Sequence, residues 1–138
     1  MTDLPDVVNS RLEPLDRTLE TLETPSVLIN ADIADANLRR WQERCDKAGM
    51  ANRPHIKTHR SVAWAMRQVE LGAVGITAQK LGEAEVMADA GIADIFLPYN
   101  ILGPRKLARL KALNDRVTLS VTADSPDTLF GYASTFTA

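Results

Sequence analysis

The most restrictive feature of this chain is a regular alternation of short apolar runs with stretches long enough to form helices. The pattern predicts strands at 53–57, 74–78, 94–98 and 117–121, and helices at 31–47, 61–71, 81–90 and 104–113. Such alternation indicates an α/β fold in which right-handed crossovers join buried parallel strands. The pattern alone leaves two architectures open, a doubly wound open sheet and part of a (β/α)8 barrel.

Two further predictions concern the N-terminal third. Val27 to Ile29 form a short apolar run behind Pro25, which can only begin a strand, so we expect a buried strand at 27–29. Within the helix at 31–47, four residues recur at helical spacing and predict a buried stripe: Ala34, Leu38, Trp41 and Cys45. We expect the thiol of Cys45 to be packed in that stripe rather than reactive.

Composition narrows the class of protein. A chain of 138 residues with 45% hydrophobic and 25% charged residues is ordinary for one globular domain. Its lysines and arginines are scattered and its net charge is -2, which argues against nucleic-acid binding. A single cysteine excludes an internal disulfide and suits a reducing compartment. The N-terminus lacks the features of a secretory signal, and no stretch has the length of a membrane span, so we expect a cytoplasmic protein.

The segment Arg53-Pro54-His55-Ile56-Lys57-Thr58-His59 carries the clearest functional signal. Lys57 ends a predicted strand, and active residues of parallel α/β proteins lie at the carboxyl ends of strands. Strand alternation would place Arg53, His55 and Lys57 on one face, which must line a cleft because three such side chains do not enter an apolar core. A neutral lysine amine condenses with carbonyl groups, so Lys57 is a candidate for imine chemistry.

Other strand ends offer polar side chains that could hold a cofactor or a substrate: Thr77, Gln79, Lys80, Tyr99, Asn100, Thr122 and Asp124. We interpret Glu83, Glu85 and Asp89 as a solvated helix face. The sequence contains no dinucleotide fingerprint, phosphate loop or nucleophile elbow. Although His55 and His59 are four residues apart, they span a strand end without a supporting carboxylate cluster, so we predict no metal site.

Five segments, 24–28, 53–59, 71–77, 80–86 and 90–95, resemble one enzyme family in sequence and in order. The chain is similar to the fold-type III pyridoxal-phosphate enzymes, in the D-threonine aldolase and D-serine dehydratase-like branch, relatives of the alanine racemase N-terminal domain. The resemblance covers about residues 24–124.

The resemblance implies that Lys57 forms the internal aldimine with pyridoxal 5'-phosphate, with His55, Arg53 and Gln79 as cofactor-binding residues. It implies a lyase that acts on D-amino acids with a β-hydroxyl group, by retro-aldol cleavage or by elimination to a keto acid and ammonia. It also implies a homodimer when full length, and a divalent metal whose ligands are absent from this chain.

The polar stretch at 1–23, with its spaced leucines, is expected to form an N-terminal arm, and the resemblance implies a truncated barrel domain at 24–138. That domain would be a partial (β/α)8 TIM barrel of about four βα units. The strand at 27–29 would belong to a missing C-terminal β-domain. Two alternatives are a catalytically inactive fragment and a non-catalytic pyridoxal-phosphate-binding protein. A third is an unrelated open-sheet binding module in which Lys57 is incidental.

Overall fold

The computed structural model describes residues 22–136, so almost all of the predicted arm at 1–23 lies outside the described residues. The elements follow in the order α2 (Ala31–Lys47), the 3₁₀ helix η2 (Ile56–Thr58), α3 (Val62–Glu70), β1 (Ile76–Thr77), α4 (Leu81–Asp89), β2 (Asp94–Leu97), α5 (Pro104–Asn114), β3 (Thr118–Val121) and α6 (Pro126–Phe136). This alternation confirms the predicted α/β class. Within residues 22–136, no helix combines the length and apolarity that crossing a membrane requires.

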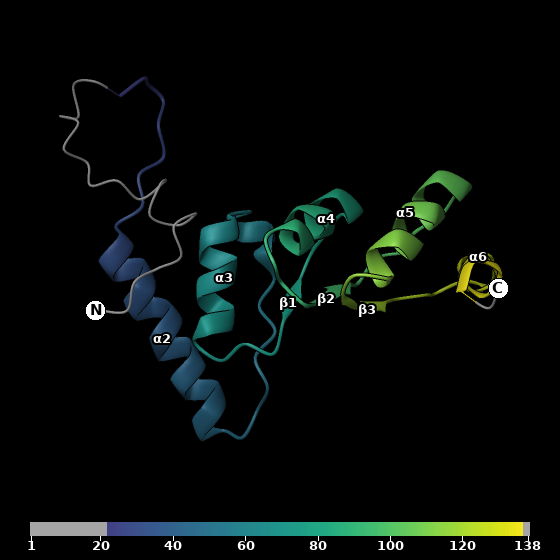
Figure 1. Cartoon of the computed structure of the whole chain (residues 1–138). Helices are drawn as coiled ribbons and strands as arrows, with labels where there is room; N and C mark the ends of the chain where they lie inside the picture. The colour runs from purple at the N-terminus through teal and green to yellow at the C-terminus, as the bar shows by residue number, and fades with distance from the viewer. Residues whose placement is uncertain (1–21, 137–138) are drawn as a thin grey trace.

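The three strands form one parallel sheet in the order β1-β2-β3, so each strand lies beside the one that precedes it in the chain (Figure 1). Thr77 of β1 pairs with Phe96 of β2, which pairs with Ser120 of β3. His55 makes an isolated parallel bridge to Thr77 on the other side of β1. The backbone that leads to Lys57 therefore continues the sheet beyond β1.

One face of the sheet carries the hydrophobic core. Ile76, Ile95 and Leu97 point to this face and are fully buried. The helices contribute further buried side chains to the same cluster, namely Ala65, Leu81, Ala84, Met87, Leu110 and Leu113. Figure 1 shows α4 and α5 on the same side of the strands. Burial of these apolar side chains is the main force that holds the helices on the sheet.

The other face of the sheet carries polar side chains together with one aromatic ring. Residues that pair across neighbouring strands point to the same face, so His55, Thr77, Phe96 and Ser120 form one row. Ser120 is exposed and Phe96 is half-buried. The expectation of buried strands therefore holds for β1, whose two residues are both buried, but not for β3, in which exposed and half-buried residues alternate.

Two expectations for the N-terminal part are wrong. Residues 27–29 form no strand, and Val27 is 94% exposed, because nothing among residues 22–136 pairs with this segment. In α2 the buried residue is Gln42, whereas Trp41 is 56% exposed and Cys45 is half-buried. Ala34 and Leu38 are also half-buried, so the predicted stripe is only partly covered, and α2 contacts α3 through polar groups such as Asp35 and Arg67, 2.6 Å apart.

The predicted strand at 53–57 is replaced by extended backbone followed by a turn. The amides of His59 and Arg60 both donate to the carbonyl of Ile56, at 3.1 and 2.7 Å, and close the turn that contains Lys57. The sequence analysis also missed α6, in which the Oγ of Ser125 accepts a hydrogen bond from the amide of Thr128 and caps the helix.

Candidate active site

Two histidines fix the turn that carries Lys57. The backbone amide of Lys57 donates to Nδ1 of His55 at 3.2 Å, and the amide of Ser61 donates to Nδ1 of His59 at 3.0 Å. In each ring Nδ1 is an acceptor, so the proton lies on Nε2 and the ring is neutral. Nε2 of His59 then donates to Oε1 of Gln68 on α3 at 3.3 Å. The exposed side chain of Lys57 thus projects from a turn that is anchored at both ends.

The surroundings of His55 keep its ring neutral. Burial lowers the pKa of His55 below its usual value, and the positive charge of Lys57 lowers it further, whereas the carboxylate of Glu83 raises it. Nε2 of His55 is buried and has no hydrogen-bond partner among residues 22–136. A buried donor without a partner costs free energy unless a ligand supplies the acceptor.

Glu83 is a residue of this site that the sequence analysis misread as solvated. Its Oε2 accepts hydrogen bonds from the amides of Gln79 and Lys80, at 3.1 and 3.3 Å. Its Oε1 lies 3.4 Å from Nε of Arg60, and its side chain is 16% exposed. The spacing from Lys80 to Glu83 is that of a capping box, a signal that could have identified this role.

Arg53 lies at the opposite ends of the strands from Lys57. Its guanidinium donates two hydrogen bonds, at 2.8 and 3.0 Å, to the carboxylate of Asp94, the first residue of β2. Gly75 makes room for this pair, because a Cβ at position 75 would come within 2.5 Å of the carbonyl oxygen of Asp94 and 2.6 Å of Nη1 of Arg53. Contact between Arg53 and a cofactor stays a prediction.

Polar residues of the remaining strand ends meet at the same edge of the sheet as Lys57. The amide of Asn100, after β2, donates to the carboxylate of Asp124, after β3. The hydroxyl of Tyr132 accepts from the amide of Ile101 at 3.0 Å and donates to the carbonyl of Thr122 at 3.2 Å. The tyrosine belongs to α6, so the sequence analysis could not connect it with the site.

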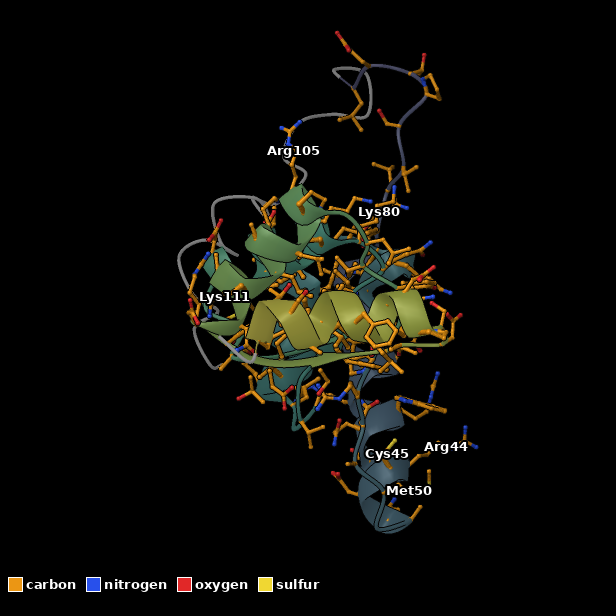
Figure 2. The ribbon with its side chains drawn as sticks, turned by 90° about the vertical axis from the view of Figure 1, so that its right-hand side faces the viewer. Arg44, Cys45, Met50, Lys80, Arg105 and Lys111 are labelled. Carbon is orange, nitrogen blue, oxygen red and sulfur yellow. The ribbon has the colours of Figure 1, made fainter. Side chains whose placement is uncertain are left out.

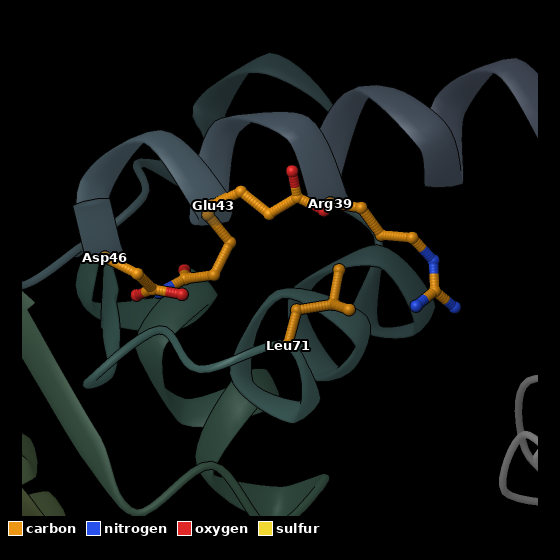
Figure 3. Close-up of a pocket in the computed structure, with 5 residues that line it drawn as sticks. Arg39, Glu43, Asp46 and Leu71 are labelled. Atoms are coloured by element: carbon orange, nitrogen blue, oxygen red, sulfur yellow. The ribbon is translucent and has the colours of Figure 1, made fainter.

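A hollow of about 210 Å³ lies elsewhere, between α2 and the end of α3 (Figure 3). It contains none of the predicted site residues and is lined by Arg39, Gln42, Glu43, Asp46 and Leu71. Within residues 22–136, no three histidine, cysteine or acidic side chains are grouped closely enough to hold a metal ion. The candidate active site is therefore the region at the carboxyl ends of the strands, where Lys57 lies.

Sequence comparison finds related enzymes, although no model of a known protein family matches the chain. It is 40% identical over 111 residues to D-threonine aldolase of Arthrobacter sp, an alignment that covers 80% of this chain and 29% of the relative. It is 40% identical over 99 residues to D-threo-3-hydroxyaspartate dehydratase of Delftia sp. (strain HT23), covering 72% and 26%. It is 33% identical over 105 residues to 3-hydroxy-D-aspartate aldolase of Paracoccus denitrificans, covering 75% and 27%.

Solved structures give the same result. D-threonine aldolase from Filomicrobium marinum superposes with a TM-score of 0.83 at 33% identity, over 86% of this chain and 32% of that one. D-threo-3-hydroxyaspartate dehydratase from Delftia sp. HT23 superposes with a TM-score of 0.76 at 37% identity, over 85% and 31%.

These relatives are fold-type III pyridoxal-phosphate enzymes, and the chain is homologous to that class. Within the class, its homologues are D-threonine aldolase and the enzymes of 3-hydroxyaspartate, which confirms the branch that the sequence motifs indicate. The chain spans between 26% and 29% of the length of the curated relatives it matches.

Proposed function

We propose that this chain is the lysine-bearing part of a pyridoxal-phosphate-dependent lyase that acts on D-amino acids with a β-hydroxyl group. The observation that carries the proposal is Lys57 in an anchored turn beside the neutral ring of His55. The related enzymes are named for cleavage or dehydration of such substrates, which supports the lyase class without dividing aldolase from dehydratase.

For the fold, we propose that residues 24–138 form about four βα units of a (β/α)8 barrel, preceded by an arm at 1–23. Two features support the barrel: the sequential order of the parallel strands and the alternation of more buried with more exposed residues along β2 and β3. The helix-covered face would be the outside of the barrel strands, and the row from His55 to Ser120 would face the interior. The exposed segment at 27–29 would pair with a β-domain outside this chain.

The residues at the strand ends fit pyridoxal phosphate. The cofactor carries phenolic and phosphate oxygens, which are acceptors, and the buried Nε2–H of His55 is a donor that has no partner among the described residues. Lys57 would hold the cofactor covalently, with His55 and Gln79 in contact with it. For Arg53 we propose a supporting role, since its pairing with Asp94 holds the same segment at the amino ends of the strands.

The protein side of the chemistry follows from these contacts. When bound, pyridoxal phosphate supplies an electron sink for the electron pair released as a bond to the substrate Cα breaks. The neutral ring of His55 keeps its Nδ1 lone pair on the backbone amide of Lys57, so the backbone from which the lysine side chain projects is held at the carboxyl end of the strands. We propose that a divalent metal also takes part, held by ligands outside residues 22–136. A variant of the related dehydratase has been solved in a metal-free form.

The first prediction tests this function through covalent labelling of Lys57. The chain is incubated with pyridoxal phosphate and reduced with borohydride, and the modified peptides are mapped by mass spectrometry. We expect one dominant adduct at Lys57, which Lys57→Arg abolishes. Lys111→Arg is the matched control, because Lys111 lies in the last turn of α5. Figure 2 shows Lys111 well away from Lys80, which follows β1 at the carboxyl ends of the strands. Labelling spread over many lysines, with none preferred at Lys57, would contradict the proposal.

A further inference from the structure

Glu83 connects the two segments that form the candidate site. One carboxylate oxygen accepts the amides of Gln79 and Lys80, at the carboxyl end of β1. The other lies 3.4 Å from the guanidinium of Arg60, three residues after Lys57. We propose that Glu83 is a positioning residue, which ties the turn after Lys57 to the end of β1 and keeps a negative charge beside His55. This proposal rests on the proposed function, because it assigns Glu83 a role in that site.

The backbone of Arg60 supports this connection. Arg60 is the one non-glycine residue with positive φ in the described part of the chain, at 49°. This left-handed conformation is unfavourable for a residue with a Cβ. Glycine would avoid the cost but could not reach Glu83. The hydrogen bond from the amide of Arg60 to the carbonyl of Ile56, at 2.7 Å, holds the conformation. Such strain is typical of functional sites, where the surrounding contacts compensate for it.

The charges around His55 determine how a change at Glu83 would alter the pKa of that ring. On its own segment, Lys57 lies on one side, and Arg53 on the other is paired with Asp94 of β2. The carboxylate of Glu83, on α4, raises the pKa of His55 and so partly offsets the lowering caused by Lys57. Arg60 is paired with Glu83. The pKa of His59 depends instead on burial, which lowers it, and on the hydrogen bonds with Gln68 and the amide of Ser61, which raise it. The two histidines should therefore respond differently to a change at position 83.

The second prediction tests Glu83 by proton NMR titration of the two histidine rings, which needs no cofactor. In Glu83→Gln we expect the pKa of His55 to fall below its wild-type value, because a charge that stabilises the protonated ring is removed. The pKa of His59 should not move. A merely structural loosening would act in the opposite direction, since a ring that becomes hydrated returns upward toward the usual histidine value. An unchanged or raised pKa of His55 would overturn the proposal.

Glu85→Gln is the matched control. Glu85 lies on the same helix, but it pairs with Arg109 of α5 at 2.9 Å and is no cause of the pKa shift of either histidine. In this variant both titrations should equal those of the wild type. A His55 shift as large as in Glu83→Gln would show a general effect of charge on α4 and would also overturn the proposal.

A second variant separates the hydrogen bonds of Glu83 from its charge, and it can be used if Glu83→Gln fails to fold. Glu83→Asp keeps the charge but shortens the reach, so hydrogen exchange at the amides of Gln79 and Lys80 should become faster. Exchange rates equal to those of the wild type at both amides would contradict the proposal that Glu83 holds the end of β1. Since neither experiment involves pyridoxal phosphate, a failed Lys57 adduct would overturn the proposed function while the Glu83 contacts are judged separately.

Discussion

At the scale of single residues, the two histidines make the same kind of hydrogen bond to the backbone. Each ring uses Nδ1 to accept the backbone amide two residues further on, Lys57 for His55 and Ser61 for His59. Burial lowers the pKa of both rings below the usual histidine value of 6.5. The folded chain therefore prefers neutral rings, and below about pH 6.5 the unfolded chain binds protons more readily.

This linkage gives the third prediction. The stabilisation by neutral histidines is complete above about pH 6.5 and is lost as the pH falls toward the lower pKa values of the folded state. The free energy of unfolding, measured by urea denaturation, should fall as the pH is lowered through this range. His59→Asn should make that dependence shallower, because its Oδ1 still accepts the amide of Ser61 but does not titrate. Equal pH dependence in both proteins would contradict this account.

At the scale of elements, Arg53, Gly75 and Asp94 lock the amino ends of the strands together. The fourth prediction is that Gly75→Ala lowers the free energy of unfolding by about 1–3 kcal/mol, because the added methyl overlaps the Arg53–Asp94 pair. Gly82→Ala is the control: on α4 the nearest atom to its new Cβ is Nη2 of Arg109 at 3.8 Å. It should raise stability by about 0.5–1 kcal/mol, since alanine favours helices over glycine. Urea titrations showing similar changes in both variants would contradict the steric explanation.

The elements also show why part of the structure followed from sequence. Apolar periodicity with glycine after the helix ends predicted α2 to α5 and three strands near their observed bounds. The same periodicity could not reveal the turn at Lys57, because it depends on single side-chain bonds of His55 and His59. The strand at 27–29 was overpredicted because a strand requires a partner that sequence pattern does not show.

For the candidate site, the sequence predicted its location at the carboxyl ends of the strands, but it did not reveal two residues whose hydrogen bonds connect the segments there. The strand ends placed Lys57, Asn100 and Asp124 on one edge, as the rule for parallel sheets requires. Glu83 was missed because a carboxylate on a helix looks solvated until its backbone partners are known. Tyr132 was missed because α6 carries glycine, serine and threonine in place of a clear apolar stripe.

At the scale of the whole molecule, one end of the fold presents apolar surface. On α6, Leu129 is 58% exposed and Phe130 is 72% exposed. Among residues 22–136, β3 has a hydrogen-bonded neighbour only on the β2 side. Exposed apolar patches and unpaired strand edges favour association with other chains. In the proposed barrel, this end would meet the next βα unit.

The fifth prediction is that the isolated chain self-associates through this end. Sedimentation velocity should show a sedimentation coefficient that rises with protein concentration, and Phe130→Lys should reduce that rise by replacing exposed apolar surface with a charge. Val86→Lys is the matched control, since Val86 is also an exposed apolar helix residue, at 53%, but lies on α4. The control should associate as the wild type does, because the edge of β3 and the surface of α6 are intact. Equal effects of the two lysines would show that net charge, rather than the α6 surface, governs association, and would remove this support for a barrel that continues beyond α6.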